Sequence, residues 1–135
     1  MAVGGAVPVS GEAKPYSKAQ QLARGERRYR RKVASPKSWQ RIIDAKRGDC
    51  RCLSLGECGG QLQFHHLWPR DLHGPDVEDN IVPLCAYHHA LVTLMHEQTC
   101  RAMIAGLSDA EYAFVTTEAG EQIWERAYGL VYIRV

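Results

Sequence analysis

The spacing of hydrophobic residues predicts a short helix after residue 35. Ser35-Pro36 is typical of an N-cap followed by the first helical residue. Apolar side chains then recur on one face until Gly48 ends the pattern, at Trp39, Ile42 and Ile43. We therefore expect a short amphipathic helix that packs on a core.

The next stretch predicts a turn, a strand and a loop. Residues 50–60 contain three cysteines and three glycines, a composition typical of a tight knuckle. Residues 61–67 (QLQFHHL) alternate between apolar and polar positions and predict a β-strand. The stretch from Pro69 to Asn80, with Gly74-Pro75 as its turn signal, is predicted to be a loop.

The last third of the chain has a helical pattern. From about Leu84 the spacing predicts a helix with an apolar face formed by Leu91, Leu94 and Met95. Ser108 and Glu111 fit a capping box, so a further helix is expected toward Glu118, with Gly120 as its end. A short helical piece follows at Ile123, Trp124 and Ala127, and residues 130–135 form an apolar tail that adds a strand or covers the core.

Length and composition place the chain in one class. With 135 residues, 45% hydrophobic and 24% charged, it fits one compact domain that is too apolar for general disorder. We find no apolar run long enough to span a membrane, and residues 1–9 lack the positive charge of a signal peptide. We therefore expect a cytoplasmic protein whose five cysteines are metal ligands or thiols rather than disulfides.

The net charge of +2 hides two opposite parts of the chain. Residues 1–51 carry 13 Lys and Arg against 4 Asp and Glu, a net of +9, whereas residues 52–135 carry a net of −7. We expect residues 1–34 to form a flexible basic extension that contacts an anionic partner, although a solvated tail has the same composition. Its candidate contacts are Arg27, Arg28, Arg30, Arg31 and Lys32.

Cysteines and histidines gather in one segment, since all six histidines lie between residues 65 and 96. Cys85 and His88 have the spacing at which the start of a helix presents two ligands to a tetrahedral zinc. Cys58, followed by two glycines, is expected to join them, with Cys50 as the fourth ligand and Cys52 as its alternative. Such a site would stabilise a small core by on the order of 10 kcal/mol. Cys100 stands apart and is predicted to be a buried thiol.

His65 and His66 form a second group of interest together with His89. Adjacent residues on a strand point to opposite faces, so His65 and His66 are expected to differ in role. One can bind a catalytic metal while the other takes a proton from water near neutral pH. His89 lies about 100° around the helix from His88 and faces a different site. The alternative is a pair of structural histidines beside a zinc knuckle.

The ordered combination of these motifs resembles the HNH endonucleases, most closely the small HNH proteins of bacteriophages and actinobacterial genomes. The resemblance rests on Leu-Gln-Phe-His65-His66-Leu, Gly74-Pro-Asp76 and Asp79-Asn80-Ile-Val-Pro-Leu-Cys85-x2-His88-His89. It implies an α+β fold in which a small ββα-metal finger with a zinc knuckle is flanked by helices. The nuclease domain would span residues 35–135, with a motif core at 48–97 and a helical part at 98–135.

The resemblance also implies a role for each matching residue. His66 corresponds to the general base that activates water, and His65 and His89 to the ligands of a catalytic Mg²⁺, Mn²⁺, Ni²⁺ or Zn²⁺. Asn80 corresponds to the residue that braces the loop. Cys85 and His88 correspond to half of the structural zinc site. Apart from the resemblance, Arg70 lies just past the predicted strand and is a candidate phosphate contact, with a solvated arginine as the alternative.

Two positions depart from the family pattern. Thr93 stands where many relatives have a further histidine, and His96, seven residues after His89, is expected on the same helix face but roughly 10 Å away. His73 stands where relatives often have glycine and is expected to fill the loop rather than to contact phosphate.

The resemblance implies a metal-dependent DNA endonuclease that acts as a monomer or homodimer, with DNA and phage terminase or other DNA-processing proteins as partners. It would work without a membrane, in the host cytoplasm if a phage encodes it. The alternative from a different class is a zinc-stapled module that binds nucleic acid without cutting it.

Overall fold

The computed structural model describes residues 31–134. The chain divides into two units, Met1–Arg30 and Arg31–Val135, and the described residues lie in the second. The predictions for Arg27, Arg28 and Arg30, and for most of the basic extension, therefore lie outside the described residues.

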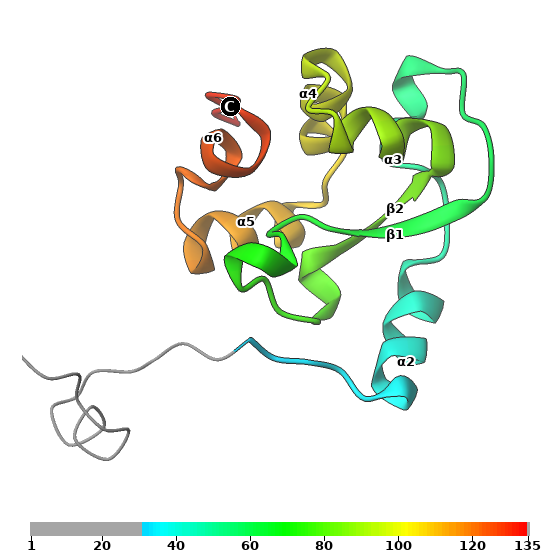
Figure 1. The fold of residues 1–135 in the computed structure, drawn as a ribbon, viewed down its shortest axis with the longest axis vertical. Helices are drawn as coiled ribbons and strands as arrows, with labels where there is room; N and C mark the ends of the chain where they lie inside the picture. Colours follow the sequence, from blue (N-terminus) through cyan, green and yellow to red (C-terminus); the bar gives the residue numbers. More distant parts are fainter. Residues whose placement is uncertain (1–30, 135) are drawn as a thin grey trace, which may run out of the picture. The chain divides into compact units, whose positions relative to one another are not determined.

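A two-stranded antiparallel sheet lies at the centre of this unit (Figure 1). Strand β1 (Leu62–His66) pairs with β2 (Ile81–Cys85) in a register that sets His66 opposite Ile81. Helix α3 (Ala86–Thr93) follows β2 without a loop. The strand predicted at residues 61–67 is confirmed, but the helix predicted from Leu84 begins two residues later. The reason is that β2 is buried along its whole length, so its apolar run shows no alternation.

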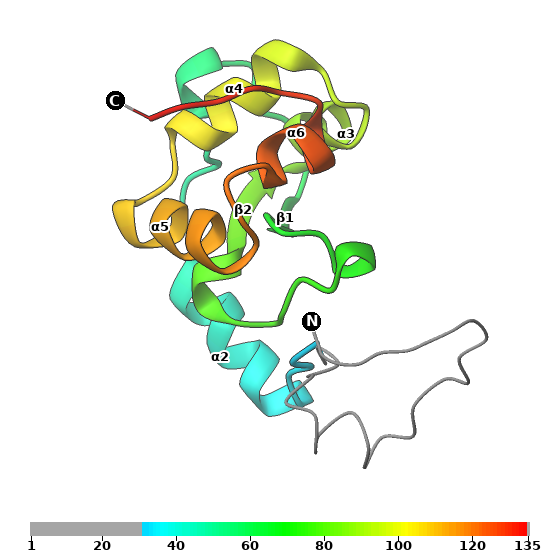
Figure 2. The ribbon, with the colours of Figure 1, turned by 90° about the vertical axis from the view of Figure 1, so that its left-hand side faces the viewer.

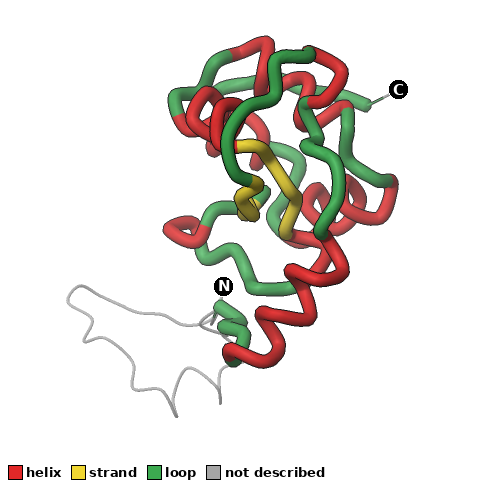
Figure 3. The backbone as a smooth tube through the Cα atoms, turned by 90° about the vertical axis from the view of Figure 1, so that its right-hand side faces the viewer, coloured by secondary structure: helices red, strands yellow, loops and turns green. Residues whose placement is uncertain are grey.

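Helices surround this sheet, as Figures 1 and 2 show, and Figure 3 marks the two strands in yellow among the red helices. The other helices are α2 (Pro36–Lys46), α4 (Glu97–Ala105), α5 (Asp109–Glu118) and α6 (Ile123–Tyr128). Side chains from the sheet and from the last three helices form one core, which includes Leu84, Met103, Ile104, Val115 and Trp124. The α+β class predicted from the sequence is confirmed. No helix in residues 31–134 has the length and apolar character that crossing a membrane requires.

The helix ends follow the sequence signals. The Ser35 hydroxyl accepts a hydrogen bond from Ser38 N and caps α2, and Ser108 and Glu111 form the expected capping box of α5. Gly120, with φ of 98°, separates α5 from α6. The apolar tail adds no strand over residues 129–134, and Leu130 instead packs into the core.

The predicted helix face of Leu91, Leu94 and Met95 is wrong. Helix α3 ends at Thr93, and Leu94 and Met95 are 76% and 47% exposed. Met95 adopts a left-handed conformation (φ 58°), and the His96 side chain then caps α4 by accepting from Thr99 N. His89 and His96 thus lie on different helices, and His96 serves as a helix cap.

Glu111 joins three segments through a buried ionic cluster. Its carboxylate contacts Lys46 at the end of α2 and Arg51 in the cysteine knuckle, where Arg51 Nη2 donates at 2.9 Å. Burial would raise the pKa of this carboxyl, but the hydrogen bonds from Arg51 and Lys46 lower it to about 2. The stabilisation is therefore present above the ordinary value of 4.5 and is lost as pH falls from 4.5 toward 2.

We expect Glu111→Gln to lower the free energy of unfolding at pH 7 by about 3 kcal/mol, because two cations lose a buried partner. Urea denaturation at pH 7 measures the effect. The difference in unfolding free energy between Glu111→Gln and wild type should shrink as the pH falls below 4.5. The matched control is Glu118→Gln, on an exposed position of the same helix. Equal losses in both variants would show that the cluster contributes nothing beyond surface charge.

Candidate functional site

Cys50, Cys58, Cys85 and His88 converge on one point, with ligand atoms all within 4.8 Å of one another. Cys50 and Cys58 come from the knuckle before β1, Cys85 ends β2, and His88 lies in the first turn of α3. Three chain segments thus meet there. Of the residues described, this is the only group of three or more Cys, His, Asp or Glu side chains placed to hold a metal ion.

The distances within this Cys₃His cluster fit a tetrahedral zinc ion. Bonds of about 2.3 Å to sulfur and about 2.0 Å to nitrogen place the two kinds of ligand about 3.5 Å apart. The Sγ atoms of Cys50, Cys58 and Cys85 lie 3.5, 3.6 and 3.2 Å from Nδ1 of His88. The cluster could therefore hold a metal ion such as zinc.

Backbone N–H groups favour the thiolate form of Cys85. His88 N and Gly59 N point to its Sγ at 3.3 and 3.4 Å. Burial alone would raise the pKa of Cys85, but these two hydrogen bonds hold it below its ordinary value. Because metals bind thiolates, this arrangement prepares the sulfur for a cation.

The two remaining cysteines lie outside the Cys₃His cluster. Cys52 is fully buried and points its thiol to Thr99 O at 3.5 Å, and burial together with the neighbouring thiols raises its pKa to about 12. Burial likewise raises the pKa of Cys100 to about 11. Neither sulfur belongs to the group of converging ligand atoms, so the structure places Cys50 rather than Cys52 in the cluster.

His65 and His89 lie face to edge, with ring centroids 5.2 Å apart, on β1 and α3. The hydroxyl of Tyr128 donates to Leu67 O at 2.6 Å, so its oxygen accepts a hydrogen bond from His65 Nε2–H at 2.8 Å. His65 therefore keeps a free lone pair on Nδ1. Burial, with smaller effects from His89 and His66, lowers the pKa of His65 to about 3 and keeps the ring neutral.

His89 is held in the complementary tautomer. Its Nδ1 lies 2.5 Å from the amide oxygen of Gln63, which can only accept, so Nε2 is left with the lone pair. Burial also lowers the pKa of His89. The pair thus offers two neutral nitrogen ligands, each fixed by a neighbour of the kind that orients metal-binding histidines. A divalent cation there would complete its coordination with water or phosphate oxygens.

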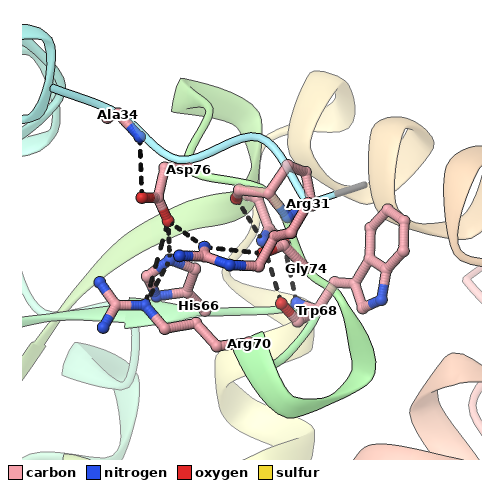
Figure 4. A network of polar contacts seen from close by, with 9 residues as sticks. Arg31, Ala34, His66, Trp68, Arg70, Gly74 and Asp76 are labelled. Atoms are coloured by element: carbon pink, nitrogen blue, oxygen red, sulfur yellow. Dashed lines mark hydrogen bonds and ion pairs between the residues drawn. The ribbon is translucent and has the colours of Figure 1, made fainter. Parts of the chain in front are cut away.

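His66 points to the opposite side of β1 from His65. Its Nε2 lies 2.7 Å from Oδ1 of the buried Asp76 (Figure 4). Its ring stacks on Trp39 of α2 at 5.8 Å between centroids. Burial lowers the pKa of His66, and nearby Arg70 and Arg31 lower it further against the opposing effect of Asp76. The imidazole is therefore neutral near pH 7 and able to accept a proton.

Residues 31–34 pack against the loop that carries Asp76. Arg31 Nη1 donates to Asp76 Oδ1 at 2.5 Å and to Gly74 O at 3.1 Å, and Ala34 N donates to Asp76 Oδ2 at 3.0 Å. Arg31 and Ala34 are thus tied by hydrogen bonds to the loop at residues 74–76. Arg31, predicted as a phosphate contact, pairs with Asp76, whereas Lys32 lines a cavity of about 490 Å³ beside α2.

Arg70 follows β1 in a short 3₁₀ turn, Arg70–Leu72, inside the stretch predicted as loop. Its side chain is 59% exposed, and its Nε lies 3.4 Å from His66 Nε2. The guanidinium also stands 5.9 Å from the centre of the Trp39 ring. Arg70 therefore presents a cation beside His66.

Asn80 is fully buried and braces the connection between the strands. Its amide donates to Trp68 O and Pro75 O, and its Oδ1 accepts from Trp68 N at 2.8 Å. A Cβ atom at Gly74 would lie 1.6 Å from Trp68 O, so the tight crossing needs glycine there. His73 ends the 3₁₀ turn in the left-handed region, with φ of 72°, as expected at a position where glycine would serve.

Sequence reasoning missed three residues of this site. Asp76 was part of a recognised motif but had no assigned role, Gln63 was interpreted only as a strand position, and Tyr128 was given no role. Gln63 stands two residues before His65 and so shares its strand face, a signal that could have been used. Tyr128 lies 63 residues from His65, and no local pattern links them.

Comparison of the chain with protein-family models, with curated proteins and with solved structures finds no match. Function is therefore inferred from the geometry of the site.

Proposed function

We propose that the protein is a metal-dependent HNH-type endonuclease that hydrolyses DNA phosphodiester bonds. The observation that carries the proposal is the arrangement of three neutral histidines at the β1–α3 junction. The rings of His65 and His89 lie 5.2 Å apart between centroids and each keeps one nitrogen free to bind a cation, while His66 is held separately by a carboxylate. The Cys₃His cluster beside them fixes the β2–α3 turn that carries His89.

The proposed chemistry assigns one task to each group. His66 takes a proton from water, the water oxygen bonds to phosphorus, and the bond from phosphorus to the 3′ oxygen breaks; that oxygen then takes a proton from solvent. His65 and His89 would hold the divalent cation, whose charge, when bound, stabilises the phosphorane and the leaving oxygen. The exposed guanidinium of Arg70 is placed to hold the phosphate.

We expect the zinc-loaded protein to nick supercoiled plasmid only after a second divalent ion, Mg²⁺, Mn²⁺ or Ni²⁺, is added. His89→Ala should require a higher concentration of that ion for half-maximal cleavage, because only one of two protein ligands remains. His96→Asn, on the next helix, is the matched control because asparagine also caps helices. A metal requirement that is the same in both variants would contradict the assigned cation site.

The basic residues before Arg31 are proposed to supply affinity for the DNA backbone. Deleting Met1–Arg30 should weaken duplex binding and reduce the log–log salt slope by about 0.9 for each phosphate that is no longer neutralised. The deletion ends before Arg31 because that side chain anchors the Asp76 loop. The full-length control replaces Arg27, Arg28 and Arg30 with Gln, and an unchanged slope in both would show that the extension does not contact DNA.

A second candidate function is a zinc-stapled nucleic-acid-binding module that does not cut. One observation favours it: in residues 31–134, neither His65 nor His89 belongs to a group of three potential metal ligands. Such a module would shift a labelled duplex without added Mg²⁺ and leave it intact over time.

A further inference from the structure

We propose that Asp76 is the positioning residue of the catalytic base, fixing the tautomer and the orientation of His66 so that Nδ1 is the atom that accepts the proton from water. The inference rests on the proposed nuclease function. It assigns to Asp76, which belongs to the Gly74-Pro-Asp76 motif but had no role there, a contact with the base rather than with the metal.

The carboxylate of Asp76 is itself fixed on both oxygens (Figure 4). It is only 5% exposed, and Ala34 N donates to Oδ2 while Arg31 Nη1 donates to Oδ1. Asp76 N in turn donates to Lys32 O at 2.8 Å. The carboxylate therefore cannot rotate without breaking its hydrogen bonds to residues 31–34, and the oxygen that faces His66 has a defined place.

A carboxylate that stays ionised can only accept hydrogen bonds. Burial would raise the pKa of Asp76, but the hydrogen bonds from His66, Ala34 and Arg31 lower it to about 2. His66 Nε2, at 2.7 Å from Oδ1, must therefore carry a proton and donate it. The lone pair of the neutral imidazole is then on Nδ1. The contact from Arg70 Nε, at 3.4 Å, is longer and does not compete.

An amide cannot replace this carboxylate. If the amide nitrogen of Asp76→Asn took the place of Oδ1, it would face the guanidinium of Arg31 and could only donate to His66 Nε2, which would move the imidazole proton to Nδ1. If that nitrogen took the place of Oδ2, it would face the backbone N–H of Ala34, and two donors would oppose each other. Asp76→Asn should therefore either disfavour the reactive tautomer or loosen the loop that holds His66.

Trp39 supports the same geometry from the face of the ring. Its indole lies nearly parallel to the imidazole, with an interplanar angle of 9°. Asp76 thus holds the edge of His66 and Trp39 holds one face, so rotation of the ring is restricted in both directions.

The test compares wild type, Asp76→Asn and Asp71→Asn, the last removing the same charge from an exposed position of the same loop. Long-range ¹H–¹⁵N NMR reports the tautomer of His66, whose signals are assigned by their disappearance in His66→Gln. Single-turnover cleavage of a labelled duplex gives the maximal rate and the enzyme concentration at which half of that rate is reached. We expect Nε2–H in wild type and Asp71→Asn. In Asp76→Asn, His66 should no longer be in that tautomer, and the maximal rate should fall by between about 10²- and 10⁴-fold. The half-saturating enzyme concentration should change less than about twofold.

Two results would overturn the role of Asp76 while leaving the nuclease proposal in place. One is an active wild type whose His66 is protonated on Nδ1, a measurement that does not depend on how the variant folds. The other is an Asp76→Asn variant that keeps the wild-type cleavage rate, or whose cleavage rate falls while the tautomer of His66 stays the same. A wild type that binds duplex but never cleaves it contradicts the proposed function itself, and the role of Asp76 falls with it.

Discussion

Chelation of the structural metal at neutral pH is expected to unfold the unit that begins at Arg31. The four candidate ligands come from the knuckle, the end of β2 and the start of α3, so an ion bound there would tie these three segments together. A closed zinc site contributes on the order of 10 kcal/mol, as much as the whole stability of a typical domain of about 5–15 kcal/mol. Circular dichroism during titration with a chelator, with released zinc measured in parallel, should show both signals change together.

Matched cysteine variants separate the metal from general packing. Cys85→Ser removes a ligand and should abolish stoichiometric zinc binding. Cys52→Ser keeps a donor for Thr99 O and should retain about one zinc per chain. A chelated protein that keeps its full helical signal, or a Cys85→Ser variant that retains tightly bound zinc, would contradict the structural role of the cluster.

Replacing His66 with Ala is expected to lower the single-turnover cleavage rate by between about 10²- and 10⁴-fold, the usual contribution of a general base. Zinc content and duplex affinity should stay within about twofold of wild type, because His66 lies on the opposite side of β1 from His65 and is not part of the Cys₃His cluster. The rate is measured with enzyme in excess over a labelled duplex at saturating divalent ion.

The control for this variant is His73→Asn. His73 lies in the same loop region but with φ of 72°, and asparagine tolerates that left-handed conformation better than alanine does. We expect its cleavage rate to match that of wild type. Equal rates for His66→Ala and wild type would remove His66 as the base.

The sequence predicted those parts of the fold that depend on local signals. Ser35-Pro36 and the capping box at Ser108 located two helices, and the alternation at residues 61–67 located β1. The prediction failed at β2, because a fully buried strand has no alternation to distinguish it from a helix. It failed again at Leu94 and Met95, where the chain leaves the helix on a left-handed residue that no glycine marks.

The sequence likewise predicted only the part of the candidate site that depends on local signals. Ligand spacing and the two glycines after Cys58 led to the Cys₃His cluster, and the choice between Cys50 and Cys52 needed the structure because both have the same chemistry. The residues that orient the histidines were beyond sequence reasoning. Asp76 and Tyr128 act through contacts across 10 and 63 positions, which arise only when the chain is folded.

The measurement that tests the nuclease proposal most directly is analysis of the ends of a cleaved duplex. Zinc-loaded wild type is incubated with labelled duplex, with and without Mn²⁺ or Mg²⁺, and the products are offered to DNA ligase. We expect metal-dependent strand breaks with 3′-hydroxyl and 5′-phosphate ends that the ligase reseals, and no breaks with His66→Ala. Duplex that is bound yet remains intact with every divalent ion tested would contradict the proposal.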